Sequence, residues 1–210
     1  MLVDLAILSL LGGVLCLERI TLQMMISRPV VAGPIIGLVL GEPHIGLVSG
    51  ALVELLWIDR LAVGAYVPPH DTIVVVLVTA GAAIGGRELS PFSQEIMAFS
   101  VLLYLPAGIL GQRMDVWVRH YNDRLAREVL EEVKAGNIRA VSRNHLRAIL
   151  RTWLLATAFI FVAAVAGLFL TQIIFPPLPS SVLRMLHYTY FFLPLLGIGV
   201  ALNTIQHRGA

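Results

Sequence analysis

Two carboxylates and a histidine stand inside apolar stretches of this sequence, where charged side chains are rare. Glu54 lies within GALVELLW, and Asp71 directly follows Pro68-Pro69-His70. A carboxylate placed in hydrocarbon is disfavoured by about 2.5 to 3.5 kcal/mol, so such residues tend to face a cavity and to mark a pathway. An ionised carboxylate accepts several hydrogen bonds, so it suits a ligand that carries several hydroxyl donors. Glu54, Asp71 and the neighbouring His70 are therefore candidate ligands for such a substrate.

Both carboxylates also have a structural interpretation. Glu54 can form an ion pair with Arg28 or Arg60. Asp71 precedes TIVVV, where an aspartate can cap a helix by accepting hydrogen bonds from free backbone N–H groups. Either structural role is compatible with substrate binding, so both interpretations stay open.

Two uncharged polar residues, Gln23 and Asn203, lie near or within apolar runs. Each is expected to bind either a substrate or a neighbouring helix. The sequence has no phosphate-binding G-x-x-x-x-G-K-[ST] motif, no nucleophile elbow and no histidine pair at metal-ligand spacing. We therefore expect no catalytic residue, no metal and no cofactor in this chain. Phosphorylation of His70 is not expected, because it follows a double proline in an apolar region.

Composition indicates a protein that folds in a lipid bilayer. Hydrophobic residues make up 58% of the 210 residues and charged residues only 13%, whereas about 25% charged residues is usual in soluble domains. The length allows about six or seven spans of about 20 residues each, which favours one membrane domain over residues 1–210. The net charge of +2 is small, and we interpret it as a signal for membrane orientation, with no nucleic acid as partner. Cys16 is the single cysteine, which excludes an internal disulfide.

Several segments are predicted to be ordinary membrane helices. Thr152–Phe175 carries no charge and ends at Pro176-Pro177, Leu186–Gln206 has aromatic residues near one end, and Ile96–Gly111 forms a third span. Residues 152–210 are thus expected to form the C-terminal membrane spans. Met1–Leu17 is expected to be a retained first helix, because Asp4 stands where a signal peptide would carry a basic residue.

The region 29–86 is different, because Gly and Pro interrupt its apolar stretches repeatedly. Broken or re-entrant helices leave backbone groups unpaired, which is tolerated only where protein or a water-filled cavity covers them. Such interrupted segments point to the substrate region of a transporter. The alternative is a set of kinked helices packed through small residues, as Gly46, Gly50 and Ala51 would permit.

Residues 113–151 form a polar, basic stretch with nine of the fifteen Lys and Arg residues of the chain. The positive-inside rule places this stretch in the cytoplasm. Apolar residues at helical spacing predict one cytoplasmic amphipathic helix that stops at Gly136-Asn137 and serves as a connector in the membrane interface. Docking of a soluble partner is the alternative. The expected fold class is thus an all-α, polytopic integral membrane protein with broken or re-entrant helices.

The interrupted region also carries a family signature. The run RPVVAGPIIGLVLGEPHIGLVSGALVELLWIDRLAVGAYVPP, residues 28–69, strongly resembles the IIC permease subunit of the mannose/fructose/sorbose family of phosphoenolpyruvate-dependent sugar phosphotransferase systems. That family has RP, then GLxLGD, TGLxxGAxxEL and GAxxPPD. The later GNIRAVSRNH and GIGVALNTI segments are also similar to family segments. The chain departs at Gly41-Glu42, where the family has Gly-Asp, at His70-Asp71, where the acid usually follows the prolines directly, and at its end, where relatives continue with another apolar segment.

The resemblance implies a subunit that binds and moves a hexose without making a bond. Its implied partners are a IID membrane subunit and the IIA and IIB phosphocarrier proteins, which phosphorylate the sugar at the cytoplasmic face of the bacterial inner membrane. Membrane lipid and an oligomeric assembly are further expectations. Two alternatives remain open: a regulatory or scaffolding relative that no longer transports, and an ion-coupled secondary transporter that uses Glu54 and Asp71.

Overall fold

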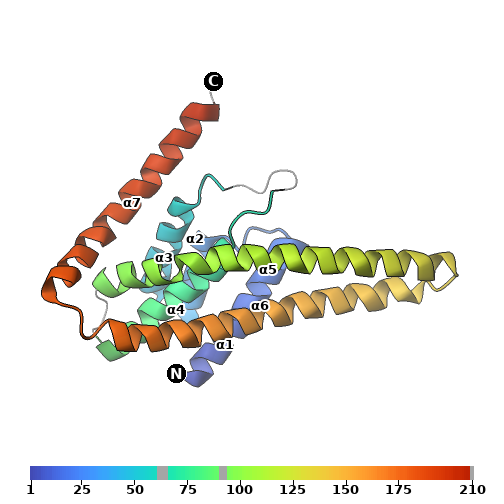
Figure 1. The fold of residues 1–210 in the computed structure, drawn as a ribbon, viewed down its shortest axis with the longest axis horizontal. Helices are drawn as coiled ribbons and strands as arrows, with labels where there is room; N and C mark the ends of the chain where they lie inside the picture. Colours follow the sequence, from blue (N-terminus) through green and yellow to red (C-terminus); the bar gives the residue numbers. More distant parts are fainter. Residues whose placement is uncertain (61–65, 90–93, 209–210) are drawn as a thin grey trace.

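The chain folds into a bundle of α-helices around one buried helix (Figure 1). The computed structural model describes residues 1–60, 66–89 and 94–208, and within these residues the regular secondary structure is helical. The helices in chain order are α1 (Leu2–Thr21), α2 (Pro29–Val39), α3 (Pro43–Leu56), α4 (Asp71–Leu89), α5 (Gln94–Lys134), α6 (Arg139–Ile174) and α7 (Ser180–Arg208). The all-helical membrane fold expected from the sequence is confirmed.

Three helices in the described part of the chain, α5, α6 and α7, are long and apolar enough to cross a membrane. They contain the three spans expected from the sequence. The expected end at the double proline is confirmed, because α6 ends at Ile174, just before Pro176 and Pro177. The helix expected at the start of the chain is α1.

Helices α5 and α6 form a long antiparallel hairpin that projects from the bundle (Figure 1). Helix α5 has 41 residues, so it is about 60 Å long, roughly twice the ~30 Å of the hydrocarbon core. The hairpin turns at Gly136, which adopts the left-handed conformation with φ of +88° and ends the helix as a C-terminal glycine often does. Across the turn, Arg143 pairs with Glu132 at 2.9 Å.

This hairpin refines the expectation for residues 113–151. The helical structure and the stop at Gly136-Asn137 are present, but the helix before the stop is continuous with the preceding span and is not a separate element. Residues 113–134 continue α5, and residues 139–151 form the beginning of α6. The physical reason is that residues 112–135 contain neither Gly nor Pro, so nothing in the backbone breaks the helix after it leaves the apolar segment.

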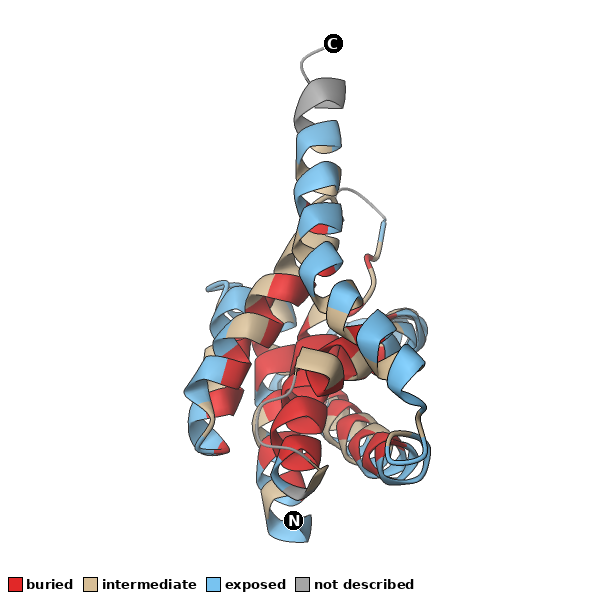
Figure 2. Cartoon of the chain, turned by 90° about the vertical axis from the view of Figure 1, so that its left-hand side faces the viewer, coloured by how far each residue is buried: buried red, intermediate tan, exposed pale blue. Residues whose placement is uncertain are grey.

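Helix α4 is the centre of the bundle and contacts α1, α2, α3, α5 and α6. Its residues from Ile73 to Val78 are all fully buried, and Figure 2 shows the buried residues gathered in the middle of the molecule. A helix that is apolar on every side is expected in such a position. The N-terminus of α4, where Asp71 lies, is thereby fixed in relation to all the surrounding helices.

Helices α2 and α3 form a short hairpin of the broken type expected from the sequence. With 11 and 14 residues, they are about 17 and 21 Å long, and neither can cross the ~30 Å hydrocarbon core. The expected packing through small residues also holds for Gly46 and Gly50. A Cβ atom at Gly46 would lie 2.3 Å from the carbonyl oxygen of Gly33, and one at Gly50 would lie 2.4 Å from that of Pro29. The two backbones therefore touch directly.

We expect Gly46→Ala to destabilise the protein, because the added methyl group meets backbone that cannot move aside. Overpacking of this kind costs about 1 to 3 kcal/mol. The matched control is Gly199→Ala in α7, since nothing lies within 4 Å of a Cβ atom at that position. Melting temperature in detergent and membrane abundance check the prediction. Equal stability of the two variants would show that the α2/α3 contact is looser than described.

Candidate substrate site

The segment between α1 and α2 is held in place by the carboxylate of Glu18. Its Oε1 accepts a hydrogen bond from the backbone N–H of Met24 at 2.5 Å, and its Oε2 accepts one from Ser27 N–H at 2.8 Å. Gln23 and Met25 in this segment have φ of +53° and +63°, a conformation that costs free energy in residues other than glycine. Glu18 is itself buried. The hydrogen bonds to its charged side chain therefore stabilise a strained turn.

Ser27 links this turn to the beginning of α4. The Thr72 hydroxyl donates to the carbonyl oxygen of Ser27 at 3.0 Å, and both residues are buried. Thr72 follows Asp71 and Ser27 precedes Arg28, so one hydrogen bond fixes the positions of two charged side chains. The turn, the start of α2 and the start of α4 thus meet at one end of the bundle.

Asp71 forms an ion pair with Arg19 at this end. The Arg19 Nη1 atom lies 2.6 Å from Asp71 Oδ1, and the same oxygen accepts a hydrogen bond from Thr72 N–H at 2.8 Å. The cap role considered for Asp71 is present only in part. Asp71 is the first residue of α4 and bonds the N–H of the next residue, whereas the N–H of Ile73 points to His70 Nδ1 at 3.4 Å. The Asp71 side chain keeps 30% of its surface exposed, which leaves oxygen lone pairs accessible to a ligand.

Glu54 pairs with Arg28, one of the two partners considered for it. The Arg28 Nη2 atom lies 2.8 Å from Glu54 Oε1, and Val30 N–H donates to Oε2 at 3.4 Å. Arg60, the other partner considered, pairs with Asp59. Because Arg28 follows Ser27 directly, the Glu54 pair and the Asp71 pair lie at the same end of the bundle.

His70 lies beneath this polar end. Its side chain is only 1% exposed, with Nδ1 3.3 Å from Arg19 Nη1 and Nε2 3.7 Å from Asp115 Oδ2. Two hydrogen bonds hold the segment before α4 against α5. His70 N–H donates to the Gly108 carbonyl oxygen at 2.9 Å, and the Gln112 side-chain amide donates to the Val67 carbonyl oxygen. Gly111 permits this contact, because a Cβ atom there would lie 2.8 Å from His70 Cβ. The His70 ring is thus enclosed by protein.

The structure thus brings together four of the five candidate residues. Glu54, His70 and Asp71 are joined through Arg19, Ser27 and Arg28, and Gln23 lies exposed in the turn that contains Ser27. Asn203 is exposed on α7, and no contact in the described part of the chain connects it with the other four. Among the described residues, no group of three or more His, Cys, Asp or Glu side chains could hold a metal ion.

Sequence reasoning did not identify Glu18, Arg19 and Asp115 as site residues. Glu18 and Arg19 stand near the end of an apolar helix, where charged residues are common, so their types alone gave no signal. Asp115 is different: it is buried and follows the apolar face of α5 that contains Tyr104, Gly108 and Gly111. Its place at i+4 from Gly111 on that face is a signal that could have separated it from the exposed charges of residues 113–151.

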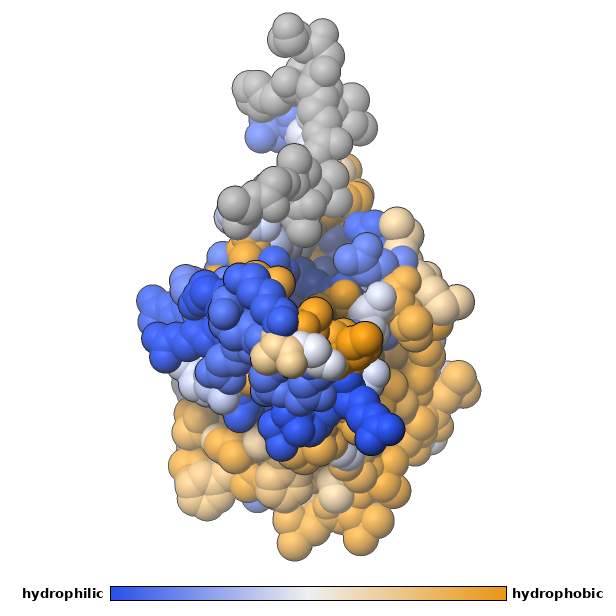
Figure 3. All heavy atoms as spheres, turned by 90° about the vertical axis from the view of Figure 1, so that its right-hand side faces the viewer, coloured by the Kyte–Doolittle hydropathy of each residue, from blue (hydrophilic) through white to orange (hydrophobic). Residues whose placement is uncertain are grey.

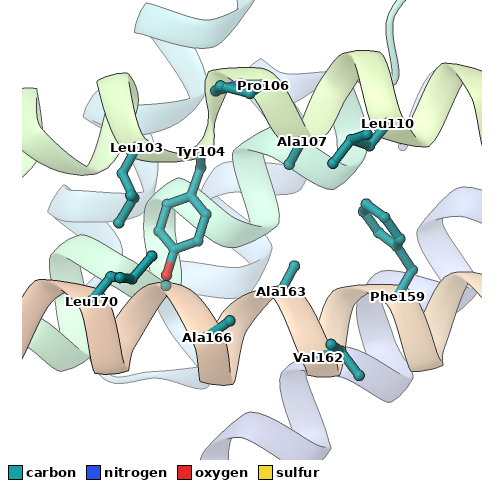
Figure 4. Close-up of a pocket in the computed structure, with 11 residues that line it drawn as sticks. Leu103, Tyr104, Pro106, Ala107, Leu110, Phe159, Val162, Ala163, Ala166 and Leu170 are labelled. Carbon is teal, nitrogen blue, oxygen red and sulfur yellow. The ribbon is translucent and has the colours of Figure 1, made fainter.

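A second candidate cavity of about 330 Å³ lies between α5 and α6 (Figure 4). Apart from the Tyr104 hydroxyl, its walls are aliphatic, aromatic or glycine, with Leu103, Leu110, Phe159 and Leu170 among them. A sugar needs several hydrogen-bonding partners once it leaves water. This cavity cannot supply them, so the polar end of the bundle is the better candidate for a substrate site.

Three helices of membrane-spanning length, a broken hairpin and polar residues gathered beside it are features expected of a membrane permease. The family model described as the PTS system sorbose-specific IIC component matches residues 2–209. The chain belongs to this family.

Individual relatives agree with this family and differ in the sugars that their names specify. A 93-residue stretch is 34% identical to an Escherichia coli (strain K12) IIC component whose name specifies N-acetylgalactosamine, covering 40% of this chain and 70% of that protein. The fructose permease IIC component of Bacillus subtilis (strain 168) is 22% identical over 184 residues, which cover 85% of this chain and 64% of that protein. The chain therefore spans about two thirds of the length of these two relatives.

The fold is also similar to a solved structure. A chain in the cryo-electron microscopy structure of the mannose transporter ManYZ in complex with microcin E492 superposes with a TM-score of 0.66. The match covers 97% of this chain and 78% of that chain, at 19% sequence identity. At this identity the similarity is one of fold.

We expect Glu18→Gln to loosen the turn before α2. The amide keeps one acceptor oxygen but loses the charge, and hydrogen bonds to a charged group contribute about 1.5 to 3 kcal/mol each. Hydrogen exchange of residues 22–28 should therefore become faster than in the unmodified protein. Glu128→Gln, which changes an exposed carboxylate on α5, is the control. Unchanged protection of residues 22–28 in Glu18→Gln would show that this carboxylate does not hold the turn.

Proposed function

We propose that this chain is the sugar-translocating IIC subunit of a mannose/fructose/sorbose-type phosphotransferase system in the bacterial inner membrane. The observation that carries the proposal is the connection through Ser27, which holds the carboxylates of Glu54 and Asp71 at one end of a broken-helix bundle. Their oxygens are acceptors suited to sugar hydroxyl groups. Gln23 in the adjoining turn supplies an amide that can both donate and accept.

The location of this polar end supports phosphorylation of the sugar at the cytoplasmic face. His70 contacts Asp115 and Gly108 of α5, and α5 continues from there into the basic hairpin. A cytoplasmic hairpin places the candidate site toward the face where IIA and IIB phosphocarriers act. The chain would then release sugar to these proteins without making a bond itself.

A IID membrane subunit is part of the proposal. The candidate ligands in this chain are few, and the two carboxylates already pair with arginines, so a complete sugar site needs further hydrogen-bonding groups. The exposed apolar residues of α7, which include Phe191, Leu195 and Leu196, require cover from lipid or from another subunit. A multisubunit assembly fits both requirements.

A second candidate function is a regulatory or scaffolding relative that no longer transports. The observation that favours it is that Glu54 and Asp71 are both engaged in ion pairs, as purely structural carboxylates would be. An ion-coupled transporter would use the same two residues. Dependence of uptake on phosphoenolpyruvate separates this last possibility from a phosphotransferase.

The orientation of the hairpin can be tested by cysteine labelling. We expect a cysteine at Asn137, in the hairpin turn, to be unreactive toward an impermeant thiol reagent added outside intact cells. Ser180→Cys should react, because Ser180 is exposed at the start of α7, just beyond the end of α6 that lies opposite the hairpin. Cys16 is buried and should contribute little background. Labelling at position 137 with protection at position 180 would reverse the proposed topology.

A double-variant design separates sugar binding by Glu54 from its structural pairing. Glu54→Gln should weaken sugar uptake about tenfold or more, since it removes a charge-assisted acceptor worth about 1.5 to 3 kcal/mol. Glu54→Gln alone also leaves Arg28 without its partner, which is itself destabilising. If Glu54 binds sugar, the double variant Arg28→Gln/Glu54→Gln should remain defective in uptake at normal abundance.

The measurement is uptake of a labelled hexose panel by cells that express the whole operon, with and without phosphoenolpyruvate. Asp71→Asn should also lose uptake, because the amide lacks the charge of the carboxylate. The helix start should stay intact, because asparagine also caps helices. Asp123→Asn, on the exposed face of α5, is the control. Recovery of uptake in the Arg28→Gln/Glu54→Gln variant would assign Glu54 a structural role and contradict the proposed site.

A further inference from the structure

A hollow of about 490 Å³ lies between α5 and α6 near the base of the projecting hairpin. Its wall combines arginines, one carboxylate, a tyrosine and leucines, namely Arg147, Arg151, Glu128, Tyr121, Leu150 and Leu154. The two arginines and the carboxylate give the wall a formal charge of +1. This hollow is separate from the candidate sugar site and from the apolar cavity of Figure 4.

Arg151 has an oriented guanidinium group with an unused hydrogen-bond donor in this hollow. Its guanidinium carbon lies 3.7 Å from the centroid of the Tyr121 ring, a stacking contact that fixes the plane of the guanidinium group. Its Nη1 atom is enclosed but has no hydrogen-bond partner in the described part of the chain. A buried donor without a partner is costly. Arg147 lines the same hollow and has a weak contact, at 3.4 Å, with Asn144 Oδ1.

The hollow lies at the boundary between polar and apolar surface. Arg151 is the last charged residue before the charge-free segment 152–175 of α6. On α5, the exposed Trp117 lies 6.2 Å from Tyr121 between ring centroids, and Trp and Tyr gather where membrane meets water. Figure 3 views the hairpin end. Hydrophilic residues gather at this end, and hydrophobic residues lie below them and to their right. We therefore expect the arginines to lie at the depth of lipid headgroups.

Apolar surface continues from the hollow toward the bilayer centre along the same two helices. Leu150 and Leu154 are about half exposed, and the apolar cavity of Figure 4 begins at Phe159, about 7.5 Å further along α6. A ligand with an anionic head and hydrocarbon chains fits this sequence of surfaces. Free phosphate would leave the leucines uncovered.

We propose that this hollow binds the phosphodiester group of an anionic phospholipid. The phosphate oxygens accept hydrogen bonds from Arg151 and Arg147, and the acyl chains lie along Leu154 toward the apolar cavity. One phosphodiester carries a single negative charge, which matches the formal charge of the wall. Basic pockets between membrane helices on the cytoplasmic side are suited to such headgroups. The bound lipid would fix the hairpin relative to the membrane surface.

The test compares lipid retention by the full chain in native mass spectrometry after exchange into phosphatidylglycerol or phosphatidylcholine with the same acyl chains. We expect retained phosphatidylglycerol to exceed phosphatidylcholine. The variant Arg147→Gln/Arg151→Gln should lower the affinity for phosphatidylglycerol about 30-fold, which at 1.4 kcal/mol per tenfold corresponds to the ~1 kcal/mol expected for each arginine. The control Arg124→Gln/Arg127→Gln removes two exposed charges of α5 outside the hollow and should retain the preference.

Several outcomes would overturn the proposal. These are equal retention of the two lipids by the unmodified chain, an equal loss in the control variant, and displacement of the lipid by inorganic phosphate. Lipid binding unchanged in Arg147→Gln/Arg151→Gln, with loss of a co-purifying phosphocarrier protein, would assign the hollow to that protein instead. A measurement on the unmodified chain guards against misfolding of the variant: phosphatidylglycerol with a photoreactive acyl chain should label α6 near Leu154 and Phe159. Labelling confined to other helices would contradict the assignment.

Discussion

The hydrogen bonds from two backbone N–H groups to the Glu18 carboxylate are the constraint on which the rest of the site depends. Hydrocarbon tolerates irregular backbone only where other protein groups satisfy it. Glu18 supplies the acceptors for two backbone N–H groups of the turn before α2, and Ser27 connects this turn to Thr72 at the start of α4. Because α4 packs against five other helices, its position is fixed by the core. The turn bonded to α4, and the charged residues beside that turn, are fixed with it.

Two arginine–carboxylate pairs offset four of the charges at the polar end of the bundle. Arg19 pairs with Asp71 and Arg28 pairs with Glu54, so each carboxylate has a partner that offsets part of the cost of removing it from water. The pairs remain partly exposed, which leaves oxygens accessible to hydroxyl groups. A neutral sugar can donate hydrogen bonds to these oxygens without adding charge to the site. This arrangement suits a site that must bind its ligand and then release it.

The sequence predicted the general architecture well because the relevant signals are local. Each signal determines the structure of the residues next to it. These signals are the apolar runs of α6 and α7, the double proline after α6 and the repeated Gly and Pro residues of α2 and α3. The uninterrupted passage of α5 into the hairpin was missed, although residues 112–135 lack Gly and Pro, because the change from apolar to polar composition suggested a boundary. The partnership of Arg19 with Asp71 joins residues 52 positions apart. Only the packing of α1 against α4 reveals it.

The position of bound sugar in an experimental density map of the assembled complex would show whether Glu54 and Asp71 form the substrate site. The complex would be prepared with the sugar that its cells take up. We expect density for a sugar with hydroxyl groups within hydrogen-bonding distance of a carboxylate oxygen of Glu54 or Asp71, close to the turn that contains Gln23 and Ser27. Sugar density away from both carboxylates, with the Arg19–Asp71 and Arg28–Glu54 pairs undisturbed, would contradict it.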